Sequence, residues 1–495
     1  MTDALLASIP KDLFLAGKFV PASSGQRFTT LDPATGDALA EVARADARDV
    51  DVAVAAAKAA FEDGRWRLMP GSRRAEILWK VGELIEANAD ELALLESLDN
   101  GKPVAAARNI DLRQAAQHFK YHAGWCTKIE GETMPVSWPR HLAYTTREPV
   151  GVTANITPWN YPIIMAARNL APALACGNSV ILKPSEETPL TALYLARLLA
   201  EAGLPEGTLS VLPGFGGEAG AALAAHGDVD RLFFTGGHVT ARKIVEASAG
   251  NFKRLTLELG GKTPFIVFPD ADIDAALAAA VNGAFINQGQ NCCALSRLYV
   301  HGDIADGFIE ALVARTEALR VGPGTDPRSN LGPLISRAHL QRVCGHIDNA
   351  KADDARLLSG GDRLDGPGNF LRPAIFDRVA DEARLTSDEV FGPVLAVYRF
   401  KSSVEAIARA NRSPYGLSAS VWTQDLSRAH EIAARIRAGT VWVNCFSRFD
   451  SAAPWGGVKQ SGYGTGIGAH AIDEYTQPKA VWIDTSTGAG KEFAP

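Results

Sequence analysis

Apolar residues recur at helical spacing along two stretches near the N-terminus. In residues 46–63, alanine and valine return every three or four positions between charged residues, and residues 72–101 carry the same pattern. Positions with this spacing share one face of an α-helix, so both stretches are predicted to form amphipathic helices. Gly101, which follows "ESLDN", is a candidate C-terminal cap.

Past residue 149 the pattern changes to short apolar runs that are rich in β-branched residues and alternate with helical stretches. This alternation predicts βαβ crossovers and a parallel sheet that is buried on both faces. The predicted strands are 150–157, 179–185, 208–214, 231–237 and 254–261, and the predicted helices are 163–178, 191–205, 218–226 and 240–250.

A second α/β series follows the first. A chain of 495 residues is too long for one simple core, so we expect at least two domains, with the boundary near Gly260–Gly261. Two strand patterns, "RHLAYTTREP" and "KAVWIDTST", lie outside both series and are predicted to form ribbon arms that pair with each other or with another subunit. The second series comprises strands at 262–270 and 297–303 and helices at 272–289 and 305–320.

The composition excludes several classes of protein. A net charge of -6 without a Lys/Arg cluster argues against a nucleic-acid partner. No run reaches the ~18 apolar residues of a membrane span, and "MTDALLASIPKDLF" lacks the apolar region of a signal peptide. Six scattered cysteines favour a reducing compartment over a disulfide scaffold. We therefore expect a cytoplasmic α/β enzyme with no membrane partner.

Two glycine-containing turns are candidate phosphate sites. "PGFGGEAG" offers Gly214, Gly216 and Gly220 between a strand and a helix, one residue longer than the usual dinucleotide-binding spacing. "FTGGHVTA" offers Gly236 and Gly237 in the same setting. Either turn can direct backbone N–H groups at a phosphate, and the alternative for each is a tight turn that needs glycine only for its backbone conformation.

Three polar residues follow or end predicted strands of the first series. Asn160, in "ITPWNYP", carries an amide that can donate to an oxyanion, or it can bond its own turn. Lys183 lies at the carboxyl end of a strand, where parallel sheets bind ligands. Glu258 ends the apolar run "RLTLE", so burial would raise its pKa as a general base requires; the alternative is a carboxylate satisfied by backbone amides.

The stretch "NQGQNCCA" places Cys292 beside Cys293. A metal site would need further Cys or His at short spacing, and none lies in the turn. A bond between neighbouring cysteines is strained, and no histidine flanks the pair. The residues themselves leave two alternatives open: packing thiols or an activated nucleophile.

Read together, six motifs resemble those of the aldehyde dehydrogenase superfamily, the NAD(P)-dependent, non-acylating enzymes. The family's cysteine motif is present as "FINQGQNC" and its glutamate motif as "LELGGK". The motifs "PWN", "KPSE", "EVFGPV" and "GGVKQSG" are also present, all in family order along nearly the whole chain. The resemblance implies a Rossmann-like cofactor domain, a second α/β catalytic domain and a β-ribbon oligomerisation arm. The implied ranges are 1–128 and 149–260 for the NAD-binding domain, 261–465 for the catalytic domain, and 129–148 and 466–495 for the arm.

The resemblance also implies roles for individual residues. Cys292 would be the nucleophile that forms a thiohemiacetal and then a thioester, with Asn160 and its own N–H holding the oxyanion. Glu258 would activate the water that hydrolyses the thioester to a carboxylic acid. Cofactor-binding roles fall on Ile156, Trp159, Lys183, Glu186, Gly216, Gly236, Gly237, Leu259, Glu389 and Phe391.

The cofactor implied is NAD, with NADP less favoured. Lys183 and Glu186 would hold the adenosine ribose, and the Glu186 carboxylate would accept hydrogen bonds from free ribose hydroxyls but repel a 2′-phosphate. Four positions depart from the family pattern. Gly237 and Ala241 replace a serine and a glycine of the pyrophosphate turn, and Thr465 and Gly466 replace the arginine and glutamate that usually follow "GG-x-K-x-S-G-x-G".

A further departure concerns the substrate. Eight positions after Asn160 the family usually carries an aromatic residue, and here Arg168 stands there. With Arg168 and Arg448, a polar or carboxylate-bearing aldehyde is the expected substrate, recognised by bidentate hydrogen bonds. The alternative is an arginine paired with an internal carboxylate. The residues expected to line the pocket are Gln114, Tyr161, Ile164, Arg168, Ile286, Asn291, Cys293, Arg448, Phe449 and Trp455.

The predicted function is NAD-dependent oxidation of a small-molecule aldehyde in a homodimer or homotetramer, without a metal. One rival is a CoA-acylating semialdehyde dehydrogenase, which would typically lack the base at Glu258. A second rival is a crystallin-like structural protein without turnover, against which the intact set of Cys292, Glu258 and Asn160 argues.

Overall fold

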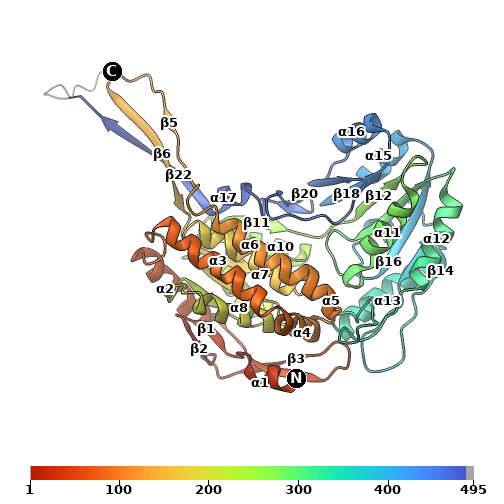
Figure 1. The fold of residues 1–495 in the computed structure, drawn as a ribbon, viewed down its shortest axis with the longest axis horizontal. Helices are drawn as coiled ribbons and strands as arrows, with labels where there is room; N and C mark the ends of the chain where they lie inside the picture. Colours follow the sequence, from red (N-terminus) through yellow and green to blue (C-terminus); the bar gives the residue numbers. More distant parts are fainter. Residues whose placement is uncertain (1, 487–495) are drawn as a thin grey trace.

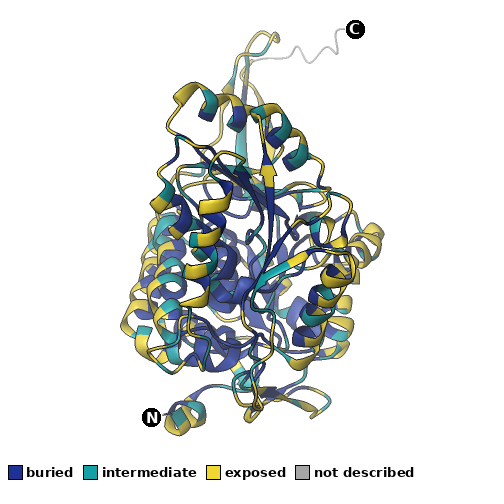
Figure 2. Cartoon of the chain, turned by 90° about the vertical axis from the view of Figure 1, so that its right-hand side faces the viewer, coloured by how far each residue is buried: buried dark blue, intermediate teal, exposed yellow. Residues whose placement is uncertain are grey.

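Two large sheets, each covered by helices on both faces, and a projecting ribbon make up the chain (Figure 1). The computed structural model describes residues 2–486. Figure 2 shows that the strands of the sheets are buried while the outer helices expose their solvent-facing sides. The predicted α/β class with two parallel-sheet series is confirmed.

The first sheet has the strand order β2-β1-β9-β8-β7-β10-β11-β21. Its five central strands, from β9 to β11, run parallel, while β1, β2 and β21 add antiparallel edges. The strand order reverses between β7 and β10, which is the switch point where open α/β sheets bind ligands. The bounds are β1 Leu13–Leu15, β2 Lys18–Val20, β7 Val152–Ile156, β8 Ser179–Lys183, β9 Leu209–Val211, β10 Arg231–Thr235, β11 Arg254–Glu258 and β21 Gly462–Tyr463.

Alternate side chains of these strands enter two separate apolar cores. In β8, Val180 and Leu182 face one core and Ile181 faces the other. This alternation is why the strands read as continuous apolar runs, since both faces are covered. One face carries α3 (Gly71–Ala87), α4 (Ala89–Asn100), α6 (Arg113–Ala123), α7 (Pro162–Ala175) and α8 (Leu190–Glu201), and the other carries α2 (Ala47–Glu62), α9 (Ala221–Ala225) and α10 (His238–Ala247).

The predicted helix at 72–101 is two helices. α3 ends and α4 begins at Asn88, where the backbone leaves the helical conformation (φ −104°, ψ 19°) and the side chain donates to the Leu84 carbonyl. Gly101 caps α4 in a left-handed conformation with φ 93°, which confirms its expected role. The helix predicted at 46–63 is present as α2, with Asp46 and Asp49 forming a capping box.

The second sheet has the order β14-β15-β16-β13-β12-β18-β19 and is parallel from β15 to β19. Its bounds are β12 Thr263–Val267, β13 Leu295–His301, β14 Arg356–Ser359, β15 Ala374–Asp377, β16 Val394–Phe400, β18 Ser418–Trp422 and β19 Thr440–Val443. The helices are α11 (Ile273–Phe285), α12 (Ala305–Glu317), α13 (Arg337–Ala352), α14 (Arg384–Ser387), α15 (Ser403–Asn411) and α16 (Leu426–Arg435).

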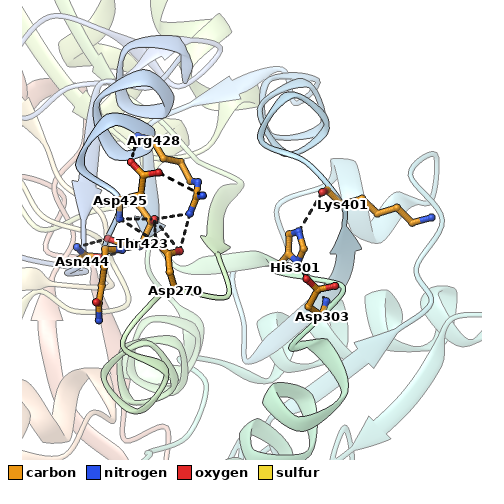
Figure 3. Close-up of polar contacts among 9 residues, drawn as sticks. Asp270, His301, Asp303, Lys401, Thr423, Asp425, Arg428 and Asn444 are labelled. Atoms are coloured by element: carbon orange, nitrogen blue, oxygen red, sulfur yellow. Dashed lines mark hydrogen bonds and ion pairs between the residues drawn. The ribbon is translucent and has the colours of Figure 1, made fainter.

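Polar side chains fill the carboxyl edge of the second sheet (Figure 3). Asp270, just after β12, accepts hydrogen bonds from Thr423 Oγ1 at 2.8 Å, Asp425 N at 3.0 Å and Arg428 Nη1 at 2.8 Å. These partners come from the loop after β18 and from α16. These hydrogen bonds compensate the Asp270 carboxylate at this edge of the sheet.

The ribbon consists of β5 (Thr133–Met134), β6 (His141–Pro149) and β22 (Thr476–Asp484). β6 and β22 pair antiparallel from Pro149↔Thr476 to His141↔Asp484, so the two strand patterns outside the α/β series do pair with each other. The short helix α17 (His470–Tyr475) differs from the predicted arm at 466–495: its Ile472 and Tyr475 lie in the core of the first sheet. Residues 487–495 of that predicted arm lie outside the described residues.

Short elements complete the chain. They are α1 (Thr2–Ser8), β3 (Arg27–Leu31), β4 (Ala38–Ala43), α5 (Val104–Ala106), β17 (Tyr415–Gly416) and β20 (Val458–Lys459), together with single turns of π or 3-10 helix at Ala107–Leu112, Gly216–Gly220, Ser248–Gly250 and Ile286–Gly289.

Gly101 also lies in a tight seam with the segment that follows α12. A Cβ at Gly101 would lie 2.7 Å from Pro333 Cγ and 2.8 Å from Pro33 Cγ, and one at Gly332 would lie 2.0 Å from the Gly101 carbonyl oxygen. The backbones therefore meet without room for side chains.

We predict that Gly101→Ala lowers the thermal denaturation midpoint more than Gly36→Ala. Both glycines have positive φ, 93° and 80°, so alanine costs about 1–2 kcal/mol at either position. Only Gly101 has neighbours that must move, because a Cβ at Gly36 meets nothing within 4 Å. Equal shifts in differential scanning fluorimetry would contradict this reading of the seam.

Candidate active site

Candidate residues of the first sheet gather at its carboxyl edge. Asn160 follows β7, Lys183 ends β8 and Glu258 ends β11. Cys292 comes from the second sheet, in the loop that leads into the amino end of β13. The two edges are in contact, because a Cβ at Gly261, just past β11, would lie 2.4 Å from the Cys292 carbonyl oxygen.

The loop that carries Cys292 has an unusual backbone. Asn287, Gln288 and Gly289 are consecutive left-handed residues, with φ of 52°, 58° and 68°. Gly289 cannot be replaced without strain, because a Cβ there would lie 2.3 Å from the Gly392 carbonyl oxygen. Gln290 Oε1 accepts the N–H of Ile335 at 2.9 Å, which holds the loop from its other side.

Hydrogen bonds tie this loop to the turn of Asn160 in both directions. Asn287 Nδ2 donates to the Asn160 carbonyl at 2.8 Å, and Asn160 Nδ2 donates to the Gln290 carbonyl at 3.2 Å. An amide has two N–H groups, so Asn160 keeps a second donor. Within residues 2–486, the backbone N–H of Cys292 has no hydrogen-bond acceptor. Each of the two hydrogen-bonded turns thus keeps one free N–H donor, that of Asn160 in one and that of Cys292 in the other.

A buried lysine supports the Asn160 turn from behind. Lys102 Nζ donates to the Asn160 carbonyl at 3.0 Å and to Asp111, lies 3.9 Å from Glu96 Oε1, and sits 4.3 Å from the centre of the Tyr161 ring. Burial raises the pKa of Glu96 to about 8, although Lys102 opposes this. Burial also raises the pKa of Asp111, and Lys102 again opposes the rise, so one lysine stabilises the charge of two buried carboxyl groups. Sequence reasoning did not identify Lys102, since a lysine beside a helix cap gives no signal of its own.

The Cys292 thiol is partly buried and lies among weakly polar groups. Its Sγ is 3.8 Å from Asn291 Oδ1, which also accepts from Cys293 N and Cys293 Sγ, each at 3.3 Å. Contact with the Cys293 thiol and burial raise the pKa of Cys292 well above its ordinary value, and the Glu258 carboxylate adds to this. The resting group is therefore a protonated thiol that needs a base.

Glu258 is 2% exposed and forms an ion pair with Arg168, whose Nη2 lies 2.9 Å from Glu258 Oε2. Burial raises the pKa of Glu258, and the Arg168 guanidinium opposes that rise. In this structure Arg168 pairs with an internal carboxylate, which is the alternative that the sequence left open. Recognition of a substrate tail by Arg168 stays a prediction.

Lys183 and Glu186, the pair predicted to hold a ribose, are in contact. Lys183 Nζ lies 3.2 Å from Glu186 Oε2 and donates to the Pro184 carbonyl at 2.9 Å. Burial lowers the pKa of Lys183, while Glu186 opposes this. Lys183 is 2% exposed, whereas the Glu186 side chain is 35% exposed and can still accept from a ligand.

The glycine turns leave space where a pyrophosphate would be expected. A Cβ at Gly216 or Gly237 would meet nothing within 4 Å, and Gly237 begins α10 without a side-chain cap. The N–H groups of that helix end therefore have no intrahelical or side-chain acceptor. Gly236 differs, because a Cβ there would lie 2.4 Å from Cζ of Phe234, two residues earlier in the chain. The residues present fit a dinucleotide.

Glu389 and Phe391, the other predicted cofactor residues, are held in place by neighbours. Glu389 Oε1 accepts the Gly261 N–H at 3.0 Å, and burial raises the pKa of Glu389 to about 7. Phe391 has a left-handed φ of 56°, and His339 bonds its carbonyl at 2.8 Å. Burial lowers the pKa of His339 to about 4, and Arg342 donates to its Nδ1, so the neutral ring donates through Nε2. Trp159 contacts the rings of both His339 and Phe391.

The two remaining predicted cofactor residues are apolar. Ile156 and Leu259 are each 7% exposed, at the ends of β7 and β11. The Leu259 N–H donates to the Ser461 carbonyl at 3.0 Å.

Two predicted substrate residues, Phe449 and Trp455, form an aromatic cluster with Trp442, which the sequence analysis did not identify. The Phe449 and Trp455 rings are 4.8 Å apart, and Trp442 lies 5.7 Å from Phe449. Arg448 is exposed; its carbonyl accepts from Trp442 Nε1 at 3.1 Å. Of the other predicted lining residues, Ile164, Asn291 and Cys293 are buried, while Gln114, Tyr161 and Ile286 are partly exposed.

Among residues 2–486, no group of three or more His, Cys, Asp or Glu side chains could hold a metal ion. No helix in this described part of the chain has the length and hydropathy to cross a membrane.

We predict that Lys102→Met destabilises the protein strongly and that the double variant with Asp111→Leu is less affected. Removal of one partner from a buried ion pair typically costs about 3–5 kcal/mol, whereas replacement of both by apolar groups is far milder. Thermal denaturation of the wild type, both single variants and the double variant measures this. Additive losses in the double variant would show that the pair does not act as a unit.

Comparisons with known proteins identify the family. The aldehyde dehydrogenase family matches residues 19–481. The mitochondrial benzaldehyde dehydrogenase of Antirrhinum majus is 45% identical over 470 residues, which cover 95% of this chain and 88% of that protein. The mitochondrial aldehyde dehydrogenase of Homo sapiens is 44% identical over 473 residues, covering 95% and 91%.

Solved structures give the same result. The NAD+ complex of the aldehyde dehydrogenase from Bacillus cereus superposes with a TM-score of 0.96 at 44% identity, and the match covers 97% of this chain and 98% of that one. Fold, family motifs and full-length similarity coincide. The chain belongs to the aldehyde dehydrogenase family.

Proposed function

We propose that this enzyme oxidises an aldehyde to the carboxylic acid with NAD, using Cys292 as nucleophile, Asn160 as oxyanion donor and Glu258 as base. The observation that supports it most directly is the pair of hydrogen bonds between the Asn160 turn and the Cys292 loop. They join two turns that each keep one unused N–H donor, and two such donors are what a tetrahedral oxyanion requires.

In the first half of the reaction, Cys292 Sγ attacks the aldehyde carbon and the carbonyl oxygen becomes an oxyanion. The second N–H of Asn160 and the backbone N–H of Cys292 stabilise this charge. The thiol proton passes to Glu258, the carboxylate whose charge acts on Cys292, and from there to solvent. The product of this half is a thiohemiacetal.

Bound NAD supplies the nicotinamide ring that accepts hydride from the thiohemiacetal carbon. The thioester left on Cys292 is then hydrolysed: Glu258 removes a proton from water, the hydroxide adds to the carbonyl, and the C–S bond breaks. The carboxylic acid leaves and the thiol is restored. The same two N–H donors stabilise the oxyanion of this second step.

The residues predicted to bind the cofactor would hold it along the edge of the first sheet. Lys183 and Glu186 would contact the adenosine ribose, the start of α10 the pyrophosphate, and Glu389 with Phe391 the nicotinamide ribose. The Glu186 carboxylate favours NAD, because it repels a 2′-phosphate.

Hydrolysis is favoured over transfer to CoA. The base at Glu258 is present, buried and paired, as activation of a water molecule requires. A structural protein without turnover would not need the Arg168–Glu258 ion pair buried beside the Cys292 thiol. Burial of the two charges costs free energy even when they are paired.

The substrate that we propose is an uncharged aldehyde with an apolar or aromatic group. Arg168 has its charge compensated by Glu258, so the carboxylate-bearing substrate expected from sequence loses its main partner. The rings of Phe449 and Trp455 offer an apolar wall instead. Arg448 is exposed, so we propose that it contacts only a polar group at the outer end of the substrate.

We also propose that the ribbon pairs with a second copy of the chain, in a dimer or tetramer. Trp138, Leu142, Trp482 and Ile483 on the ribbon are 43–59% exposed, and large apolar side chains gathered in this way mark interaction surfaces.

The assay that tests the proposed activity follows NADH at 340 nm with an aldehyde, with NAD or NADP, and with or without CoA. Cys292→Ala is expected to abolish turnover, whereas Cys293→Ala keeps it and mainly shifts substrate preference. NADH formation should exceed NADPH formation and should not depend on CoA. Turnover by Cys292→Ala, or an acyl-CoA product, would contradict the mechanism.

A panel of propanal, benzaldehyde, lactaldehyde and succinic semialdehyde tests the substrate class. We expect kcat/KM to be highest for propanal or benzaldehyde and at least about tenfold lower for succinic semialdehyde, since an unpaired buried carboxylate costs more than about 1.4 kcal/mol. A preference for succinic semialdehyde would restore the anionic-tail interpretation.

A further inference from the structure

Two departures from the family's sequence pattern meet at one carboxylate. Arg168 stands where an aromatic residue is usual, and Gly466 stands where a glutamate is usual. In the structure both lie against Glu258: Arg168 Nη2 is 2.9 Å from Glu258 Oε2, and a Cβ at Gly466 would lie 2.5 Å from Glu258 Oε1. The two positions are 298 residues apart in sequence.

The absence of a side chain at Gly466 is what leaves room for the ion pair. The same Cβ would lie 3.3 Å from Phe233 Cζ and 3.6 Å from Arg168 Nε. Any larger residue would therefore enter the space shared by Glu258, Phe233 and Arg168. Of these groups, the Glu258 carboxylate is the end of a flexible side chain, so it is the one that would be displaced.

The side chains that act on the Glu258 carboxylate come from three parts of the chain. Arg168 approaches from α7, the Cys292 thiol from the loop before β13, and the Trp455 indole from the loop before β20. On α6, burial and the neighbouring His122 and Arg168 lower the pKa of His118 well below its ordinary value, so its ring is neutral. Arg168 is therefore the one cation among the described residues that balances the buried carboxylate.

We propose that Arg168 is a positioning residue for the catalytic base: it holds the Glu258 carboxylate ionised and oriented in the space that Gly466 leaves open. This rests on the proposed function, in which Glu258 must be ionised to accept a proton from water. Burial alone would favour the protonated acid, which cannot act as a base. The cation offsets that tendency without contacting the aldehyde.

The first test is the pH profile of acyl-enzyme hydrolysis, measured as turnover of p-nitrophenyl acetate, which acylates a reactive thiol without NAD. Arg168→Met removes the cation while the carboxylate stays buried. The pKa of Glu258 then rises, and the acidic limb of the profile moves to higher pH. We expect a shift of at least about one unit, equivalent to about a tenfold loss of rate on that limb. Arg168→Lys keeps a cation and should recover most of it.

The second test keeps both charges and closes the space between them. Gly466→Ala is expected to displace the carboxylate, so the acidic limb should shift in the same direction as in Arg168→Met. Gly250→Ala is the matched control, because a Cβ at Gly250 meets nothing within 4 Å and Gly250 lies in a turn after α10. This control should retain the wild-type profile.

A thermal double-mutant cycle tests the pair without any activity. Arg168→Met should denature at a lower temperature than the double variant Arg168→Met/Glu258→Gln, because the double variant leaves no unpaired buried charge. This measurement also covers the case in which Arg168→Met alone folds poorly. If the wild type formed no NADH with any aldehyde, the proposed function would be wrong. The thermal double-mutant cycle would still test whether Arg168 and Glu258 stabilise each other.

Two results would overturn the inference. One is an unchanged pH profile in Arg168→Met together with a KM that rises more than about tenfold for succinic semialdehyde but not for propanal, which would make Arg168 a substrate ligand. The other is a double variant no more stable than Arg168→Met, which would show that the two charges do not depend on each other.

Discussion

The reciprocal hydrogen bonds between the Asn160 turn and the Cys292 loop are the constraint on which the site depends. The two residues belong to different sheets, one at a carboxyl edge and the other at an amino edge. Asn287 could not reach the Asn160 carbonyl without three consecutive left-handed residues, and that backbone requires glycine at position 289. Lys102 fixes the same carbonyl from the other side. The positions of the nucleophile and the oxyanion donor are therefore set together, because the side-chain amide of each turn donates to a backbone carbonyl of the other.

Charge compensation is the second feature of the site. Lys102 faces Asp111, and Arg168 faces Glu258, so each of these two buried cations has an opposite partner. The Cys293 thiol and burial raise the pKa of Cys292, which favours the uncharged thiol before substrate binds. Charge then develops in the reaction itself, next to donors that are already oriented, and preorganised groups of this kind stabilise a transition state more than the ground state.

Much of the fold was predictable from the sequence because its signals are local. The alternation of apolar runs and helical stretches marked all five parallel strands of the first sheet and β12 and β13 of the second, and Gly101 marked a helix end. The break at Asn88 was missed, since the backbone leaves the helical conformation there within an unbroken apolar pattern. The motifs identified Cys292, Glu258 and Asn160 as the candidate catalytic residues, and their catalytic roles stay predictions. What sequence could not provide is pairing across distance: Arg168 with Glu258, Lys102 with Asn160, and α17 with the first core.

The closing elements of the chain set the order in which the molecule can be completed. β21 pairs with β11, α17 enters the first core, and β22 is the partner of β6. The first sheet thus lacks its edge strand, and β6 most of its hydrogen-bond partners, until residues 462–484 have been made. Long-range pairing of this kind slows folding and leaves strand edges open meanwhile. The second sheet, whose last strand β19 ends at Val443, can therefore be completed during synthesis before the first.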